Sequence, residues 1–149
     1  MQLNWKYTSF KALTVEELYA ILQLRSEVFV LEQNCVYQDA DNKDLAGFHL
    51  TGWMGNVLAA YCRILPPGLS FDDASIGRIV TSPAHRRTGN GRALVLLGIQ
   101  KTLSQFGCTT ITIGAQLYLK NFYESLGFQQ TGEEYLEDNI PHIEMQYKA

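Results

Sequence analysis

The chain has 149 residues, of which 46% are hydrophobic and 18% charged, values typical of one globular domain that we expect to span residues 1–149. Its formal net charge of −3 argues against a general nucleic-acid binder, which needs a basic face. No run has the roughly 20 apolar residues of a membrane span, and the N-terminus MQLNWKY does not resemble a signal peptide. Three widely spaced cysteines fit reduced thiols, and three scattered histidines give no metal-ligand spacing. We therefore expect a cytoplasmic protein with no membrane, nucleic-acid or metal partner.

The N-terminal half predicts one helix among three strands. Residues 3–7 alternate between apolar and polar side chains, as a short strand does. Thr14 and Glu17 have the spacing of a capping box, and the amphipathic helix that they begin should end near Glu32 or Gln33. An acidic, ordered loop follows over residues 34–44. Two further strands, 48–54 and 57–65, flank Gly55-Asn56, a two-residue hairpin signal.

The C-terminal half predicts two helices and four strands. A strand at 76–81 leads to a helix from about 89 to 106, which Gly107 can end. The next strand, 109–114, should run parallel to the strand at 76–81, because a helix connects them. A helix over 117–126 and an antiparallel pair, 128–135 with 142–147, complete the chain. The predicted order is β-α-β-β-β-α-β-α-β-β, a mixed α/β (α+β) fold.

The segment between the strand at 76–81 and the following helix carries the strongest functional signal. It contains Arg86-Arg87-Thr88-Gly89-Asn90-Gly91, an R-x-x-G-x-G pattern. Cationic side chains and glycine backbone at a helix start favour phosphate or pyrophosphate, because a helix N-terminus presents free N–H groups and partial positive charge. The glycines form neither GxxxxGK[ST] nor GxGxxG, which excludes a P-loop and the dinucleotide fingerprint.

Two motifs together resemble the superfamily of GCN5-related N-acetyltransferases (GNAT). The R-x-x-G-x-G pattern is similar to the family signature that holds the pyrophosphate of acetyl-coenzyme A. Residues 116–128, QLYLKNFYESLGF, resemble the family pattern N-x-x-A-x-x-x-Y-x-x-x-G-F at Tyr123, Gly127 and Phe128, although Gln116 and Leu119 replace its first two members. The segments LQLRSEVFVLEQNCVYQDADNKD and YLEDNIPHIEM narrow the resemblance to the ElaA-type subfamily, over essentially the whole chain.

The resemblance implies direct transfer of an acetyl group from acetyl-coenzyme A to an amine, with no metal. The backbone of the 76–81 strand would polarise the thioester carbonyl, and the Tyr123 phenol would stabilise or protonate the leaving thiolate. Arg86 and Arg92 are the expected phosphate partners, while Arg87 faces solvent. The full set of expected cofactor-binding residues is Ile79, Val80, Thr81, Arg86, Arg87, Thr88, Gly89, Asn90, Gly91, Arg92 and Tyr123.

The acceptor is expected to be an amine of a small molecule or a peptide, bound by a monomer or a homodimer. Its site should be formed by the first helix, the acidic loop and the terminal turn. The expected members are Arg25, Phe29, Gln33, Tyr37, Asp44, His49, Gln116 and His142, with Asp138 at the far side. The carboxylates Asp39, Asp41 and Asp44 either favour a cationic amine or are simply solvated.

The base that deprotonates the amine is left open by the sequence. Many relatives use a glutamate on the strand before the pyrophosphate loop, where this chain offers Arg78 and no carboxylate. The candidates are His49, Glu32, Asp44 and His142, and among these His49 is the expected catalytic residue because imidazole titrates near neutral pH.

Two other functions fit parts of the pattern. The sequences Leu24–Phe29 and Asp41–Asp44 are similar to stretches of acyl-homoserine-lactone synthases, although this chain leaves little room for a long acyl chain. The missing strand carboxylate is also compatible with a non-catalytic coenzyme A sensor.

Overall fold

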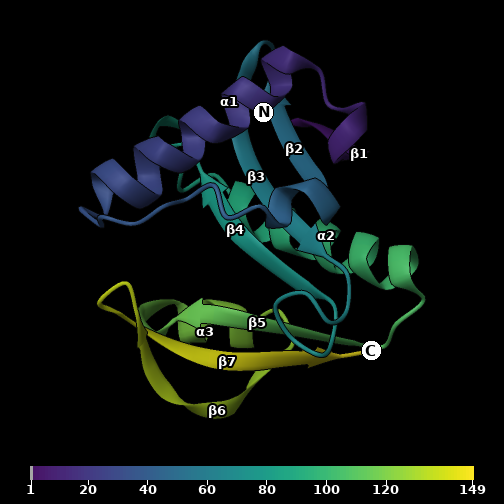
Figure 1. Cartoon of the computed structure of the whole chain (residues 1–149), viewed down its shortest axis with the longest axis vertical. Coiled ribbons are helices and arrows are strands. Elements are labelled where there is room, and N and C mark those ends of the chain that lie inside the picture. The colour runs from purple at the N-terminus through teal and green to yellow at the C-terminus, as the bar shows by residue number, and fades with distance from the viewer. Residues whose placement is uncertain (1) are drawn as a thin grey trace.

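The computed structural model describes residues 2–149 and confirms the predicted order of strands and helices (Figure 1). The strands are β1 (Asn4–Ser9), β2 (Phe48–Met54), β3 (Val57–Leu65), β4 (Ser75–Thr81), β5 (Thr110–Gln116), β6 (Phe128–Glu137) and β7 (Ile140–Lys148). The helices are α1 (Val15–Arg25), α2 (Asn90–Phe106) and α3 (Lys120–Glu124). Short 3-10 turns lie at Phe10–Ala12, Lys43–Ala46, Pro83–His85 and Leu117–Leu119. In the described residues no helix is both long and apolar enough to cross a membrane.

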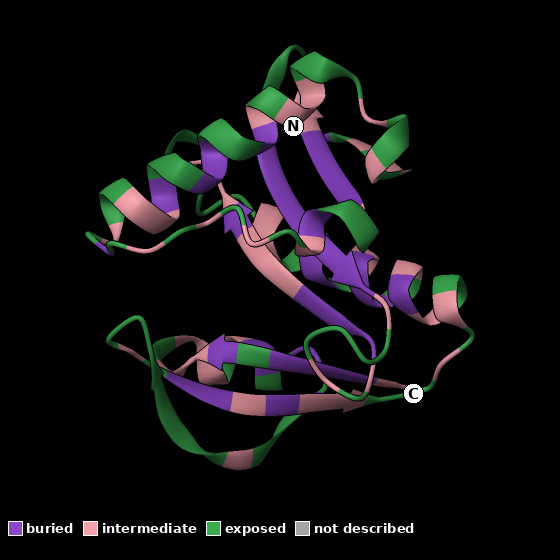
Figure 2. Cartoon of the chain, in the orientation of Figure 1, coloured by how far each residue is buried: buried purple, intermediate pink, exposed green. Residues whose placement is uncertain are grey.

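The strands form two antiparallel sheets, one above the other in Figure 1. The first has the order β1-β2-β3-β4 and the second the order β5-β7-β6. Each face of the first sheet is covered, because side chains alternate across a strand: Cys62 packs with the α2 residues Leu94 and Ile99, while the neighbouring Tyr61 packs with Ile21 of α1. Figure 2 shows the result, with β2 and β3 buried and β6 largely exposed.

The first helix is capped as predicted and ends in an unusual way. The Thr14 side chain accepts from the Glu17 N–H, and the Glu17 carboxylate accepts from the Thr14 N–H. The helix continues beyond Arg25 as a π-helical segment over Ser26–Glu32, so that its last turns end near Gln33 as expected. π-helical turns are rare and are frequent at functional sites.

The predicted helix at 117–126 is shorter than expected. It consists of a 3-10 turn followed by the five-residue α3, and Gly127 ends it with φ +102°. A left-handed φ at this position favours glycine, whose missing Cβ removes the steric penalty. The turn between β6 and β7 is tighter than the predicted loop, since only Asp138 and Asn139 separate the two strands.

The two sheets meet at β4 and β5, which are parallel as predicted and then part. Ala74 forms an isolated parallel bridge with Ile111, and the Thr112 N–H donates to the Ala74 carbonyl at 3.0 Å. No further bridge joins β4 to β5 within residues 2–149. β4 also carries one extra residue against β3, because Tyr61 pairs with Val80 whereas Arg63 pairs with Gly77. Arg78 lies in this bulge with φ +48°.

Candidate functional site

The main candidate site is a cavity of about 620 Å³ where β4 and β5 diverge, within the usual range of small-molecule sites. Its walls come from β4, β5, the π-helical segment that follows α1, the start of α2, the 117–123 segment, the β6–β7 turn and the start of β7. The cavity therefore joins both sheets, α2, α3 and the π-helical segment. Its lining includes Arg86 and Gly91 of the segment before and at the start of α2, and residues of the segment 137–142, which is remote from them in sequence.

One end of the cavity reaches the predicted anion site. α2 begins at Asn90, and its first internal backbone bond runs from the Ala93 N–H to the Gly89 carbonyl at 3.0 Å. Within the described chain, the N–H groups of residues 87–92 donate to no protein acceptor. Gly89 has φ +80°, which turns the chain into the helix, and Gly91 lines the cavity. Free amides, bare backbone and the positive helix end together make a site for a phosphate group.

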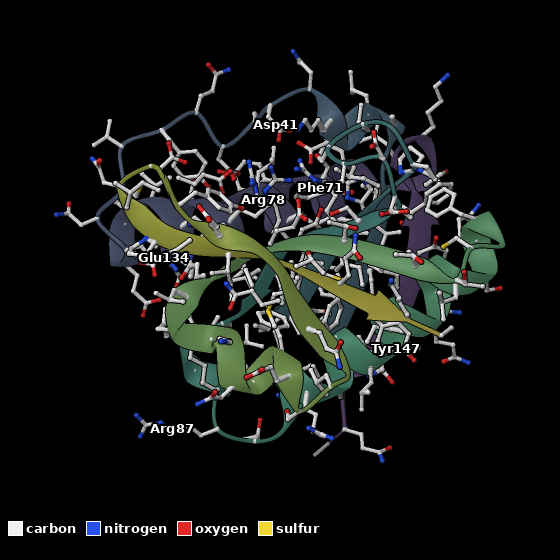
Figure 3. All side chains as sticks on the ribbon, turned by 90° about the horizontal axis from the view of Figure 1, so that it is seen from below. Asp41, Phe71, Arg78, Arg87, Glu134 and Tyr147 are labelled. Carbon is white, nitrogen blue, oxygen red and sulfur yellow. The ribbon has the colours of Figure 1, made fainter. Side chains whose placement is uncertain are left out.

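The three arginines of the R-x-x-G-x-G segment have different surroundings. Arg86 lines the cavity and forms a two-point ion pair with Glu32, with Nη–Oε distances of 2.8 and 2.6 Å. Arg92 is exposed and donates to the Ser125 hydroxyl at 3.3 Å. Arg87 is exposed and points outward at the edge of the molecule (Figure 3). Thr88 and Asn90 both donate side-chain hydrogen bonds to the His85 carbonyl, which holds the loop in shape.

Only alternate backbone N–H groups of β4 are directed toward the cavity, because the others are directed toward β3. The Ser82 N–H donates to the Ala59 carbonyl at 2.8 Å, and Val80 pairs with Tyr61. Hydrogen-bonded pairs recur at every second residue of an antiparallel ladder, so the Val80 N–H is directed toward β3. The N–H groups of Ile79 and Thr81 are directed the other way, toward the cavity. Val80 therefore lines the cavity without being one of its backbone donors.

Tyr123 lies on α3 at the wall of the same cavity. It is only 5% exposed and packs edge-on against Phe122 and Phe128. Its hydroxyl has no hydrogen-bond partner among the described residues. The hydroxyl oxygen is not fully buried, so it remains accessible from the cavity. Burial raises the pKa of this phenol above its usual value, so it carries its proton at neutral pH. The ring position is fixed, and the O–H is free to donate to whatever occupies the cavity.

The acidic loop is held by arginines, so its three carboxylates neither face an amine nor are simply solvated, which corrects both expectations. Asp44 accepts from Arg25 at 2.7 Å and from Arg63 at 2.9 Å. Asp39 accepts from Arg25 and from Arg78.

Asp41 accepts from Arg63 and Arg78, and Figure 3 labels Asp41 and Arg78. These contacts complete a six-residue cluster that consists of Arg25, Arg63, Arg78, Asp39, Asp41 and Asp44. Burial alone would raise the pKa of the Asp44 carboxyl, but hydrogen bonds from Arg25 and Arg63 hold it below its usual value. Arg25 and Asp44 line no part of the cavity.

His49, the base expected from the sequence, is also placed outside the cavity. It is 1% exposed, and both ring nitrogens are engaged: Nε2 with the Asp44 carbonyl at 3.0 Å and Nδ1 with the Tyr61 hydroxyl at 2.7 Å. A carbonyl only accepts, so Nε2 carries the proton and Nδ1 accepts from Tyr61. Burial lowers the pKa of this imidazole. His49 is a structural histidine, and it has no access to an acceptor.

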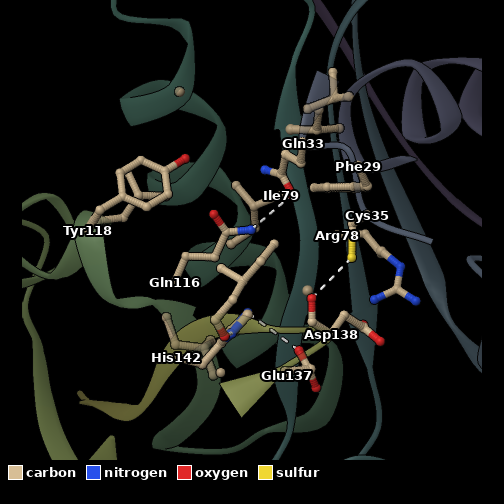
Figure 4. Close-up of a pocket in the computed structure, with 18 of the residues that line it drawn as sticks. Phe29, Gln33, Cys35, Arg78, Ile79, Gln116, Tyr118, Glu137, Asp138 and His142 are labelled. Carbon is tan, nitrogen blue, oxygen red and sulfur yellow. Dashed lines mark hydrogen bonds and ion pairs between the residues drawn. The ribbon is translucent and has the colours of Figure 1, made fainter. Parts of the chain in front are cut away.

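The other expected acceptor residues do line the cavity, and Figure 4 labels Phe29, Gln33, Gln116 and His142 among them. Gln116 donates to Gln33 at 3.3 Å across the gap, and His142 lies beside them on β7. Phe29 and Tyr37 contribute aromatic walls.

The β6–β7 turn and the end of β6 bring in the expected Asp138 together with Glu137, which the sequence did not mark. Glu137 lies 3.4 Å from His142, and the Asp138 carbonyl accepts from the Cys35 thiol at 3.3 Å. Gly114 and Ile140 line the same region. No spacing rule links a loop near residue 35 to a turn near residue 138, so only the fold reveals this contact. Among the described residues no group of histidines, cysteines and carboxylates is arranged to hold a metal.

Comparisons of the sequence and of the structure with known proteins point to the same family. An acetyltransferase (GNAT) domain model matches residues 48–149. Protein ElaA of Escherichia coli (strain K12) is 41% identical over 145 residues, covering 96% of this chain and 95% of that protein. Its crystal structure superposes with a TM-score of 0.92 at 39% identity, over 98% and 99% of the two chains.

A second solved structure agrees. An acyl-CoA N-acyltransferase from Pseudomonas aeruginosa superposes with a TM-score of 0.92 at 41% identity, covering 97% of this chain and 99% of that one. The matches span nearly every element described above, including the parted strands and the helix that begins at Asn90. The chain belongs to the GNAT acetyltransferase family and, within it, to the ElaA-type subfamily.

Proposed function

We propose that this protein is an N-acyltransferase that moves an acetyl group from acetyl-coenzyme A to an amine in a ternary complex. The observation that carries the proposal is the row of free amides at residues 87–92, which adjoins the cavity between β4 and β5 at Gly91. A diphosphate at these amides would leave the pantetheine arm to run along β4 toward Tyr123. The acyl-CoA N-acyltransferase of Pseudomonas aeruginosa, with the same fold at 41% identity, supports the donor class.

The first step is to hold and polarise the thioester. Amides of residues 87–92, with Arg86 and Arg92, neutralise the diphosphate. Arg86 must then exchange its partner Glu32 for a phosphate oxygen, which is a modest cost because an exposed ion pair contributes only about 0–1 kcal/mol. The N–H of Ile79 or Thr81 donates to the carbonyl oxygen as negative charge develops. One such donor is typically worth about 3 kcal/mol of barrier.

The second step is departure of the thiolate. The Tyr123 phenol keeps its proton because burial raises its pKa, and its hydroxyl is free of protein partners. A phenol in this position donates its proton to the sulfur as the carbon–sulfur bond breaks. The aromatic packing around Tyr123 fixes the direction of that proton transfer.

The acceptor enters from the side of α1 and the β6–β7 turn, and we infer an amine of a small molecule or a peptide. This end of the cavity combines amide groups with the side chains of Glu137 and His142. The carboxylates that face it come from the turn, since those of the acidic loop are paired with arginines. A cationic amine suits this end of the cavity.

A thiol-release assay over polyamines, amino acids, aminoglycosides and peptides with free N-termini tests the proposal. We expect acetyl-coenzyme A to be consumed with one or more amines and an N-acetyl product to appear by mass spectrometry. Tight binding of acetyl-coenzyme A with no thiol release across the panel would instead identify a sensor. A lactone product without amine acetylation would identify a homoserine-lactone synthase.

A further inference from the structure

We propose that His142, oriented by its backbone and by Glu137, is the group that takes the proton from the attacking amine. This inference rests on the proposed function and selects one of the four candidate bases that the sequence left open, since β4 itself carries no carboxylate. His142 lines the cavity on β7, directly opposite Gln116 of β5, and is only 6% exposed.

The hydrogen bonds of His142 fix its tautomer. Nδ1 lies 2.7 Å from the Ile140 carbonyl, which can only accept, so Nδ1 carries a proton. The lone pair of the neutral ring is therefore on Nε2. His49 has the opposite tautomer, with its Nδ1 lone pair occupied by the Tyr61 hydroxyl. Of the two buried histidines, only His142 has a basic ring nitrogen that accepts no hydrogen bond from the described residues, and its one charged neighbour there is a carboxylate oxygen of Glu137 at 3.4 Å.

Glu137 is the partner of the protonated ring. Its carboxylate lies 3.4 Å from Nε2, and its side chain is 60% exposed, so it reaches both the ring and solvent. Neutral imidazole gains nothing from a carboxylate at Nε2, whereas imidazolium does. Glu137 thus acts as a positioning residue that stabilises the ring after it has taken a proton and offers that proton a route to water.

The surroundings of His142 keep its ring in place. Tyr135 stacks on it with ring centroids 5.7 Å apart, and Tyr135 also pairs with it in the β6–β7 ladder. The other ionisable groups that line the cavity are Asp138, Cys35, Tyr37, Arg78, Tyr118, Tyr123 and the pair Glu32 and Arg86. The Glu32 carboxylate is engaged by both Nη atoms of Arg86. The Arg78 Nε and Nη2 are engaged by Asp39 and Asp41, so its charge is balanced within the six-residue cluster.

The protons and electron pairs balance as follows. His142 Nε2 takes one proton from the ammonium, and this proton leaves to solvent past Glu137. The lone pair that this leaves on the amine nitrogen attacks the thioester carbon and forms the carbon–nitrogen bond. The carbon–sulfur bond breaks, and its electron pair stays on the sulfur. The phenol of Tyr123 gives its proton to that sulfur and recovers one from the nitrogen. The products are an amide and a free thiol, with one proton released to solvent.

The experiment compares His142→Gln, Glu137→Gln and the control Glu134→Gln, an exposed carboxylate on the same strand that does not line the cavity. The rate of acetyl transfer is measured against pH with the amine identified in the panel above, and acetyl-coenzyme A affinity is measured separately by calorimetry. We expect His142→Gln to lower kcat about 100-fold and remove the acidic limb of the profile, with affinity unchanged. Glu137→Gln should lower kcat by less than His142→Gln does, because the protonated ring then loses the carboxylate beside Nε2, while Glu134→Gln should leave kcat unchanged.

A second measurement needs no acceptor. Nitrogen-resolved NMR of the histidine rings in the free protein should show His142 with its proton on Nδ1 and His49 with its proton on Nε2. A proton on Nε2 of neutral His142, or full activity and an unchanged pH profile in His142→Gln, overturns the inference and leaves the proposed function standing. Failure of the wild-type protein to acetylate any amine of the panel overturns both.

Discussion

At the scale of single residues, the chemistry of the donor side depends on one phenol. Tyr123→Phe removes the hydroxyl and keeps the ring that packs against Phe122 and Phe128. We expect kcat to fall about 100-fold while the Kd for acetyl-coenzyme A stays within twofold, because the lost proton transfer acts only in the transition state. Stopped-assay rates and calorimetric titration measure the two quantities. Equal turnover in the variant would remove Tyr123 from the mechanism.

Replacing the arginines of the pyrophosphate loop should weaken acetyl-coenzyme A binding at Arg86 and Arg92 but not at Arg87. Arg86→Ala and Arg92→Ala each remove a charged donor beside the free amides, and a hydrogen bond to a charged group contributes about 1.5–3 kcal/mol. We expect acetyl-coenzyme A to bind about 10-fold more weakly in each variant. Arg87→Ala is the matched control, since Arg87 is exposed and points away from the molecule. Equal loss in all three variants would indicate a general charge effect in place of a defined phosphate site.

At the scale of elements, the loop before α2 depends on its left-handed turn. Gly89 has φ +80°, and a Cβ there would meet no atom within 4 Å, so the constraint is the backbone conformation and not space. Gly89→Glu adds strain and places a negative charge at the helix N-terminus. We expect binding of acetyl-coenzyme A to be lost in calorimetry, with the helix content unchanged by circular dichroism. Gly89→Asn, which tolerates the left-handed region, should retain most of the affinity.

Most elements were predictable because their signals are local. The capping box of Thr14 and Glu17, the Gly55-Asn56 hairpin and the Gly107 helix end all depend on residues close in sequence, and the structure has each of them. The π-helical end of the first helix and the bulge at Arg78 were not predictable, since both arise from packing between elements.

The same contrast holds for the site. The anion loop is one continuous segment, so its pattern could be recognised in the sequence. Asp44 and His49 were misplaced as acceptor residues because their partners, Arg63 and Tyr61, lie on another strand. Charge in a sequence does not show which carboxylates are neutralised.

At the scale of the whole molecule, the cluster of three arginines and three aspartates links α1, the acidic loop, β3 and β4. Removing one member leaves one charge of the cluster uncompensated, which costs about 3–5 kcal/mol where the charge is buried. Asp44→Ala should lower the free energy of unfolding by about that amount in urea titrations, because Asp44 contacts both Arg25 and Arg63. Loss of less than 1 kcal/mol would show that the cluster is not structural.

The same cluster sets the acid limit of the fold. The folded-state pKa values of Asp41 and Asp44 lie below their usual range, so the stability from these groups is complete above pH about 4 and is lost as pH falls further. His49 also has a lowered pKa, so its contribution declines earlier, as pH falls below about 6.5. Urea midpoints measured from pH 8 to 3 should decline in two stages, and His49→Gln should remove the first. A single stage in the wild-type protein would contradict this assignment.

The cavity at the junction of the two sheets is where these elements act together, and a crystal structure with acetyl-coenzyme A tests that claim most directly. The account predicts the diphosphate at the amides of residues 87–92, the thioester carbonyl within hydrogen-bond distance of the Ile79 or Thr81 N–H, and the sulfur beside the Tyr123 hydroxyl. A diphosphate bound elsewhere, or a thioester outside the space between β4 and β5, would contradict it.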